Sequence, residues 1–130
     1  MENVNSLRNK FIAKDLIYST ELGAINGTLI QDSIAKAKEY VGLDVLNVHD
    51  CPNGYLRMNS IMAASILQKE LDIETIPHYT CRDRSILGTQ ADFLGAHALG
   101  IRNVLATTGD SPKHGPYKNS KPVYNYNSFE

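Results

Sequence analysis

Residues 73–110 decide the predicted fold and read IETIPHYTCRDRSILGTQADFLGAHALGIRNVLATTGD. Their pattern predicts a strand over Ile73–Thr80, a polar turn, a helix over Ile86–Leu99 and a second strand over Ile101–Thr107. Each strand runs directly into polar residues, and the second is followed by a Thr-Gly-Asp run at 108–110. Polar groups at the carboxyl ends of parallel strands are where ligands bind in α/β proteins. The stretch therefore predicts a site beyond these two strand ends.

A similar unit recurs along the chain. The predicted strands begin at Ile17, Val45, Ile73 and Ile101, which stand 28 residues apart each time. A strand, a helix and their turns need about this length, since a βαβ motif takes about 30 residues. Because hairpin signals are missing between the units, the repeat favours a parallel sheet with helical crossovers. We therefore expect an α/β fold containing four βα units.

The other predicted elements complete these units. Thr28 or Asp32 is expected to cap the helix after the first strand, and Asn59 or Ser60 lies near the start of the helix after the second. Apolar periodicity predicts the elements themselves. These are a lead-in helix at Ser6–Lys14, strands at Leu16–Leu22 and Val45–Val48, a helix that stops at Gly42 and a helix over Met58–Leu71.

We expect the chain to divide into a lead-in segment (1–15), four strands with their crossovers (16–110) and a polar loop with a truncated end (111–130). A closed parallel barrel needs eight strands, and four are predicted here. Four strands alone leave two unpaired sheet edges and one uncovered apolar face. The chain is then a small open-sheet domain, a half barrel completed by a partner copy, or a piece of a longer protein.

Composition narrows the class of protein. The 130 residues are 42% hydrophobic and 21% charged, with a net charge of −1, which is ordinary for a folded soluble chain. No basic field indicates nucleic acid or a membrane surface as a partner. The two cysteines, Cys51 and Cys81, are too few for a disulfide framework. No signal sequence or membrane span is recognisable, so we expect a cytoplasmic protein.

Four predicted strand ends place Glu21, His49 with Asp50, His78 with Thr80, and Asp110 around one rim. A carboxylate beside an apolar ligand can act as a general acid, but Glu21 is equally explained as a solvated loop residue or a helix-cap partner. His78 can hydrogen-bond a ligand, although a satisfied core histidine is the more common case. The histidines lack a third ligand at close spacing, so we expect no metal.

The polar turn after Thr80 has two interpretations. Cys81 is either a nucleophile or, more commonly at a strand end, a small buried filler. Residues 82–84 (Arg-Asp-Arg) can hold a phosphate or carboxylate. The alternative, which we favour, is an ion-pair network that clamps the loop, with Asp83 or Ser85 near the cap of the next helix.

Several of these residues also match a known family. The matching residues are the run 78–84 (HYTCRDR), Leu87, Gln90, Asp92, the segment 94–106 (LGAHALGIRNVLA) and the Thr-Gly-Asp at 108–110, with Thr20-Glu21-Leu22, Asn47-Val48 and Leu56-Arg57-Met58 upstream. In this order they resemble the methylenetetrahydrofolate reductase family. The similarity is closest to the branch found as the reductase half of homocysteine S-methyltransferase fusions.

The resemblance implies a fold and a reaction. The fold would be a parallel (βα)4 unit, the first half of a TIM (β/α)8 barrel. The reaction would be FAD-dependent reduction of 5,10-methylenetetrahydrofolate to 5-methyltetrahydrofolate with NAD(P)H, a tetrahydrofolate interconversion of one-carbon metabolism that serves methionine biosynthesis. The second half of the family barrel would come from a homo-oligomer or a separately supplied half-barrel. The alternative is an inactive half-barrel that binds a small molecule or self-associates through its open edges.

The resemblance also implies roles for single residues. Glu21 would be the general acid that protonates the folate, and Asp110 a second acidic residue near flavin and pterin. His49 stands where some members have a flavin-contacting threonine, and Thr108 stands in place of an arginine. Asn125 and Asn127 stand where acidic residues are common in this branch. The residues expected to bind FAD are His49, His78, Thr108, Gly109, Asp110, Tyr124 and Asn125.

Overall fold

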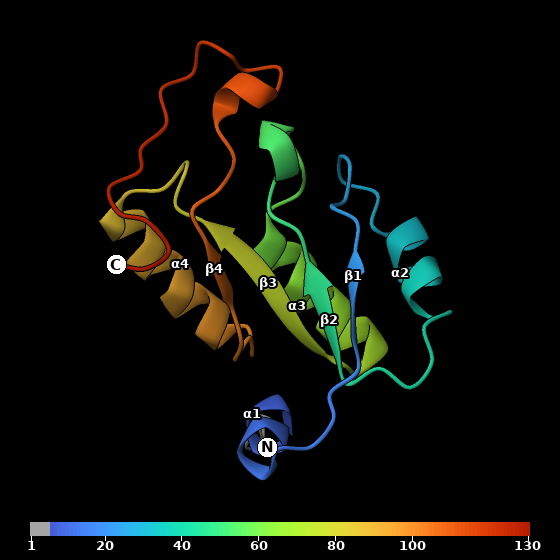
Figure 1. The fold of residues 1–130 in the computed structure, drawn as a ribbon. Helices are drawn as coiled ribbons and strands as arrows, with labels where there is room; N and C mark the ends of the chain where they lie inside the picture. Colours follow the sequence, from blue (N-terminus) through green and yellow to red (C-terminus); the bar gives the residue numbers. More distant parts are fainter. Residues whose placement is uncertain (1–5) are drawn as a thin grey trace.

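The computed structural model describes residues 6–130, so residues 1–5 of the expected lead-in segment lie outside the described part. Its strands form one sheet in the order β1-β2-β3-β4, and every neighbouring pair is parallel (Figure 1). The expected α/β fold is therefore confirmed, and the sheet is consistent with half of a (β/α)8 barrel. The strands are β1 (Ser19–Leu22), β2 (Val45–Val48), β3 (Glu74–Thr80) and β4 (Leu105–Thr107).

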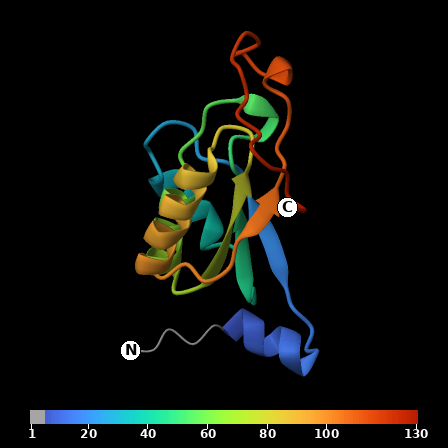
Figure 2. The ribbon, with the colours of Figure 1, turned by 90° about the vertical axis from the view of Figure 1, so that its left-hand side faces the viewer.

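Three helices connect the strands and lie on one face of the sheet, as the two views together show (Figures 1 and 2). The helix α3 packs against β3, where Thr75 Oγ1 donates to the Ala64 carbonyl oxygen at 3.4 Å. Within the described residues, no helix covers the opposite face. The helices are α1 (Ser6–Ala13), α2 (Gln31–Ala37), α3 (Ser60–Leu71) and α4 (Ile86–Ala98), with 3-10 turns η1 (Pro52–Gly54) and η2 (Pro112–His114).

The strand register separates a covered face from an open face. Leu22 pairs with Val48, both buried, and side chains alternate along a strand, so Glu21 and Asn47 point to the other side. The covered face forms the hydrophobic core with the helices. Its buried cluster comprises Leu22, Ile25, Ile30, Ala37, Leu46, Val48, Ile61, Ala63, Ala64, Leu67, Tyr79, Ala96 and Ile101. The open face corresponds to the inside of a barrel.

The lead-in helix α1 lies beyond the amino ends of the strands (Figure 1). Its first amide groups, those of Ser6 and Leu7, donate to the Glu74 carboxylate at the start of β3. A carboxylate at a helix amino terminus satisfies amides that have no partner within the helix. Asn103 Nδ2 donates to the same carboxylate at 2.9 Å, so Glu74 joins α1, β3 and the segment before β4.

Two of the expected helix caps are confirmed. The Asn59 side chain accepts hydrogen bonds from the amides of Ile61 and Met62, at 2.9 and 3.1 Å, and so caps α3. The Ser85 hydroxyl accepts from the Gly88 amide at 3.1 Å and caps α4. Both caps fix where the helices begin, directly after the polar residues that follow β2 and β3.

The expected cap of α2 is wrong. The helix begins after Ile30, which makes no side-chain cap, and Asp32 lies inside its first turn rather than before it. Ile30 is buried in the core, so packing of this apolar side chain, and not a capping hydroxyl or carboxylate, fixes the start of the helix.

The outer strands are shorter than expected, and the 28-residue spacing does not describe where they start. Before β1, the amide of Tyr18 donates to the Asp44 carboxylate at 3.0 Å instead of a strand neighbour. After α4, the Ile101 amide donates to the Ala96 carbonyl oxygen at 2.9 Å. Because this bond belongs to the end of the helix, the chain enters β4 only at Leu105.

Candidate functional site

One pocket of the molecule lies at the carboxyl ends of β2, β3 and β4. Its volume is about 330 Å³, and it opens between two predicted site residues, His49 and Asp110. Its position is the one that ligands occupy in parallel α/β sheets. The lining residues are His49, Asp50, Pro52, His78, Thr80, Thr107, Gly109 and Asp110.

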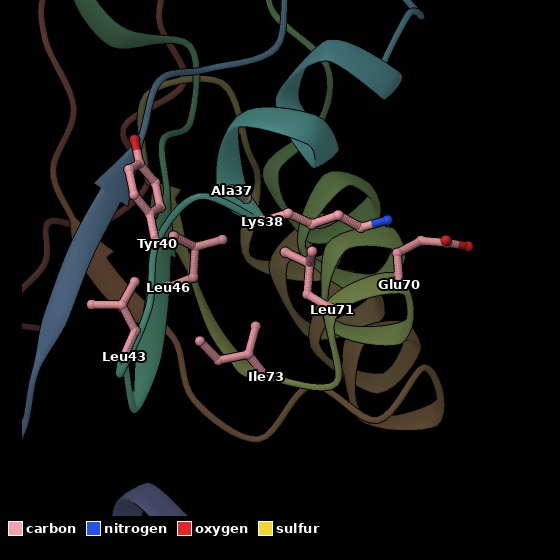
Figure 3. A pocket seen from close by; sticks show the side chains of 8 residues that line it. All are labelled: Ala37, Lys38, Tyr40, Leu43, Leu46, Glu70, Leu71 and Ile73. Atoms are coloured by element: carbon pink, nitrogen blue, oxygen red, sulfur yellow. The ribbon is translucent and has the colours of Figure 1, made fainter.

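A second pocket, of about 250 Å³, lies on the covered face near the amino ends of β2 and β3 (Figure 3). Its walls are mainly aliphatic and include Leu43, Leu46 and Ile73, with Lys38 and Glu70 at its edge. In barrels of parallel strands, this end serves stability and the opposite end serves chemistry. We therefore place the candidate site at the carboxyl ends.

Glu21 and His49 form a hydrogen-bonded pair on the open face, which we name the acid pair. Glu21 Oε2 lies 2.9 Å from His49 Nε2, and the two side chains are 62% and 27% exposed. The register explains the contact, since Glu21 stands opposite Asn47 and His49 is two residues further along β2 on the same face. The sequence placed both residues on one rim, and the structure joins them directly.

His78 lies beside the acid pair. Its ring centroid is 5.1 Å from that of His49, with the ring planes tilted by 52°. Its Nε2 atom is buried and has no hydrogen-bond partner in the described structure. Burial lowers the pKa of His78 below 6.5, and the nearby His49 acts in the same direction, while Glu21 and Asp50 act against it. A neutral imidazole nitrogen that lacks a partner is ready to bind a polar ligand atom.

Asp110 and Gly109 form the opposite wall of the pocket. Asp110 Oδ2 accepts a hydrogen bond from the Asn53 amide at 2.8 Å, which ties the turn after β4 to η1. Gly109 has a φ of +92°, and a Cβ atom there would lie 2.9 Å from Thr80 Cβ. Only glycine allows this close approach of the turn to β3.

The other three residues expected to contact flavin, Thr108, Tyr124 and Asn125, form hydrogen bonds with other groups of the protein. The Tyr124 hydroxyl donates to the Gly109 and Asp110 carbonyl oxygens, each at 3.2 Å. Asn125 Oδ1 accepts from the Ile86 amide at 3.3 Å, and Thr108 Oγ1 lies 3.1 Å from the Ser128 hydroxyl. None of these three side chains lines the pocket. They fasten the carboxyl-terminal residues to α4 and to the turn after β4.

A network that starts in the pocket wall with Asp50 and Thr80 continues through Arg84 to the partly exposed Asp92, and we name it the clamp. Asp50 Oδ2 accepts from the Thr80 amide at 2.9 Å and from its hydroxyl at 3.0 Å. Both Asp50 oxygens accept from the Arg84 guanidinium, at 2.5 and 3.2 Å, and Arg84 Nε lies 3.5 Å from Asp92. Burial alone would lower the pKa of Arg84, but Asp50 reverses this and raises it.

The favoured interpretation of residues 82–84 is therefore confirmed. Arg82, whose side chain is 3% exposed, bonds Asp83 and donates to the carbonyl oxygens of Cys51 and Asp110. These contacts join the loops after β2, β3 and β4. The role of Asp50 was missed, although a carboxylate two residues past a buried strand, facing an arginine-rich turn, was the available signal. Burial raises the pKa of the Cys81 thiol, as suits a buried filler.

These features define a protein class: an α/β chain with a polar ligand site at the carboxyl ends of a parallel sheet. The family model described as methylenetetrahydrofolate reductase matches residues 12–128 of the 130-residue chain. The chain therefore belongs to the methylenetetrahydrofolate reductase family, which confirms the resemblance. A methylenetetrahydrofolate reductase-like function follows from this membership, and enzymes of this family are generally flavin-dependent. No curated protein sequence matches the chain.

Two further findings concern other function classes. No helix within residues 6–130 is long and apolar enough to cross a membrane. Among the same residues, no group of three or more His, Cys, Asp and Glu side chains is arranged to hold a metal ion.

The pocket fits one end of a flavin by the chemistry of its polar groups. A flavin ring presents both hydrogen-bond donors and acceptors along its pyrimidine edge. His78 Nε2 is a buried polar atom without a partner, and it can donate or accept according to its tautomer. Gly109 and Asp110 line the same pocket. These residues would hold the ring.

Proposed function

We propose that this chain belongs to an FAD-dependent reductase that converts 5,10-methylenetetrahydrofolate to 5-methyltetrahydrofolate with NAD(P)H. The observation that supports this most is the convergence of Glu21, His49 and His78 at adjacent strand ends in a chain of this family. A carboxyl group beside a pocket with an unpartnered imidazole supplies proton delivery and ligand orientation.

Glu21 is proposed as the general acid. Its O–H proton passes to one of the two folate nitrogens that hold the bridging carbon, and that nitrogen takes the electron pair of the breaking C–N bond. The other nitrogen then forms the iminium with the carbon. FAD, when bound, supplies the hydride that it receives from NAD(P)H. At 62% exposure, the Glu21 side chain can reach a bound molecule on the open face.

His78 and Asp110 are proposed to orient the bound molecules. The neutral His78 imidazole hydrogen-bonds the flavin edge, and Asp110 accepts a hydrogen bond while the Asn53 amide holds its carboxylate in place. Such fixed groups lower the cost of bringing reactants into line. Thr108, Tyr124 and Asn125 are proposed to act on the site through the turn that they fasten.

The test of this function is direct. The purified chain is titrated with FAD, and binding is followed by visible absorption and by quenching of flavin fluorescence. Flavin uptake is expected, followed by anaerobic bleaching with NADH or NADPH and recovery of colour on addition of methylenetetrahydrofolate. A colourless chain that takes up no FAD would overturn function of this chain on its own. The same experiment shows whether NADH or NADPH is the preferred hydride donor.

A second candidate function is self-association without catalysis. Within the described residues, β1 and β4 are the sheet edges, and two apolar side chains of these edges are exposed, Leu16 just before β1 by 70% and Leu105 in β4 by 44%. Open edges favour strand pairing with another chain. We propose that a second copy of this chain pairs with these edges. Sedimentation distinguishes a defined dimer from a monomer or from aggregates.

We propose that the reaction takes place in the cytoplasm and serves one-carbon metabolism and methionine biosynthesis. Cys51 and Cys81 are free thiols, which agrees with a reducing compartment.

A further inference from the structure

The acid pair contains an interaction that the proposed function does not require. His49 is expected to contact flavin, yet its Nε2 is directed to Glu21 Oε2 at 2.9 Å. Among residues 6–130, this is the one hydrogen bond that the Glu21 carboxylate makes. Since Glu21 is more than half exposed, little else restrains its side chain.

The His49 ring is itself held in place. It lies against His78, with centroids 5.1 Å apart, and it lines the pocket together with the buried Asp50. Its side chain is 27% exposed, compared with 62% for Glu21. A restrained ring that donates to a mobile carboxylate fixes the position of that carboxylate.

We propose that His49 is a positioning residue for Glu21: its Nε2–H holds the carboxyl group over the open face beside the pocket. This inference rests on the proposed function for its catalytic consequence. When Glu21 gives up its proton, the carboxylate that forms keeps the hydrogen bond from His49. A charge-assisted hydrogen bond is stronger than a neutral one, so His49 helps Glu21 more after proton transfer than before it.

Two substitutions of His49 distinguish the effect of its hydrogen-bond donor from the effect of its ring. His49→Gln places an amide N–H close to the position of the imidazole Nε2–H and keeps the donor. His49→Leu removes the donor while keeping an apolar side chain of moderate size. His97→Gln is the matched control, because His97 is an exposed histidine on α4 that does not line the pocket.

The first measurement needs neither flavin nor activity. Three-bond NMR couplings across the Cα–Cβ bond of Glu21 report whether its side chain occupies one rotamer or several. One dominant rotamer is expected in the unchanged chain, in His49→Gln and in His97→Gln, and averaged couplings are expected in His49→Leu. Averaged couplings in the unchanged chain, or no change in His49→Leu, would overturn the proposal even if the chain proves to be a reductase.

The second measurement follows the two half-reactions of the flavin-loaded protein. His49→Leu is expected to slow oxidation of reduced flavin by methylenetetrahydrofolate about 10-fold to 100-fold, as loss of a hydrogen bond to a charged group does. FAD affinity and flavin reduction by NAD(P)H should change less than about 3-fold, and His49→Gln should restore most of the lost rate. Equal loss in both half-reactions, or weakened FAD binding alone, would make His49 a flavin contact instead. If the chain takes up no flavin, the proposed function fails, but the NMR couplings still test whether His49 positions the Glu21 side chain.

Discussion

The acid pair and the clamp lie at the same end of the sheet, but they are held very differently. Within the described part of the chain, the Glu21 carboxylate makes one hydrogen bond, and its side chain is 62% exposed. The Asp50 side chain is 2% exposed and accepts from the Thr80 backbone and hydroxyl and from Arg84. One carboxylate is thus free to meet a ligand, while the other fixes the strand ends. The difference indicates two roles. The clamp holds the strand ends rigidly in place, and the Glu21 carboxylate remains accessible to a ligand.

The largest expected effect tests the exposed side of this comparison. Glu21→Gln keeps the shape of the side chain but removes the acidic proton, so folate-dependent oxidation of the reduced flavin should fall about 10²-fold to 10⁴-fold. Flavin reduction by NAD(P)H should be retained. Rapid-mixing absorption at the flavin band measures both steps. Equal losses in the two half-reactions would contradict the role of Glu21 as general acid.

The second largest effect is expected in the clamp. Asp50→Ala leaves Arg84, whose side chain is 14% exposed, without its main partner, and should lower the free energy of unfolding by about 3–5 kcal/mol. Urea denaturation followed by circular dichroism measures this loss. Lys10→Ala is the control, since the Lys10 side chain is 36% exposed and its ion pair with Asp44 lies near the surface, where such pairs add little stability. Similar losses in both variants would remove the distinction between the clamp and an ordinary surface pair.

A smaller loss is expected where the turn after β4 meets β3. Gly109→Ala places a methyl group 2.9 Å from Thr80 Cβ at a positive φ, which should cost about 1–3 kcal/mol of stability and weaken ligand binding. The same denaturation experiment applies. Gly23→Ala is its control, because no atom beyond its own chain neighbours lies within 4 Å of the added Cβ. A neutral Gly109→Ala variant would show that the turn can move away from β3.

The smallest expected effect is on the pH dependence of the free energy of unfolding. Burial lowers the pKa of His78 in the folded chain below 6.5, so the unfolded chain binds the proton more readily. The His78 contribution to stability is therefore fully present above about pH 6.5 and is lost as the pH falls through the lower, folded value. Unfolding free energies measured in steps across this window should fall more steeply for the unchanged chain than for His78→Phe. Parallel curves would mean that His78 titrates alike in both states.

Sequence reasoning succeeded where local chemistry decides the structure. Val45–Val48 was placed to the residue, and Asn59 and Ser85 cap the helices that they were expected to begin. It failed at Ile101, because a buried isoleucine after a helix fits either a strand or the final helical turn. Its amide donates to Ala96 of the helix, a choice that tertiary packing makes.

The sequence predicted that the site residues lie at the ends of strands, but it did not predict which of them are in contact. Glu21, His49, His78 and Asp110 were all placed on one rim from their positions after strands. The bond between Glu21 and His49 depends on the parallel register of β1 and β2, which no spacing along the chain reveals. The clamp likewise joins Asp50 to Arg84 across 34 positions, so the pattern around each residue alone could not show it.

The position of α1 has a practical consequence for handling the molecule. This helix lies at the end of the sheet opposite the pocket, and its side chains Phe11 and Ile12 are 66% and 69% exposed (Figure 1). The carboxyl-terminal residues, by contrast, contact Gly109, Asp110 and Thr108. A sensor surface or a fluorescent label should therefore be attached on the α1 side, where it leaves the mouth of the pocket clear for titration with small molecules.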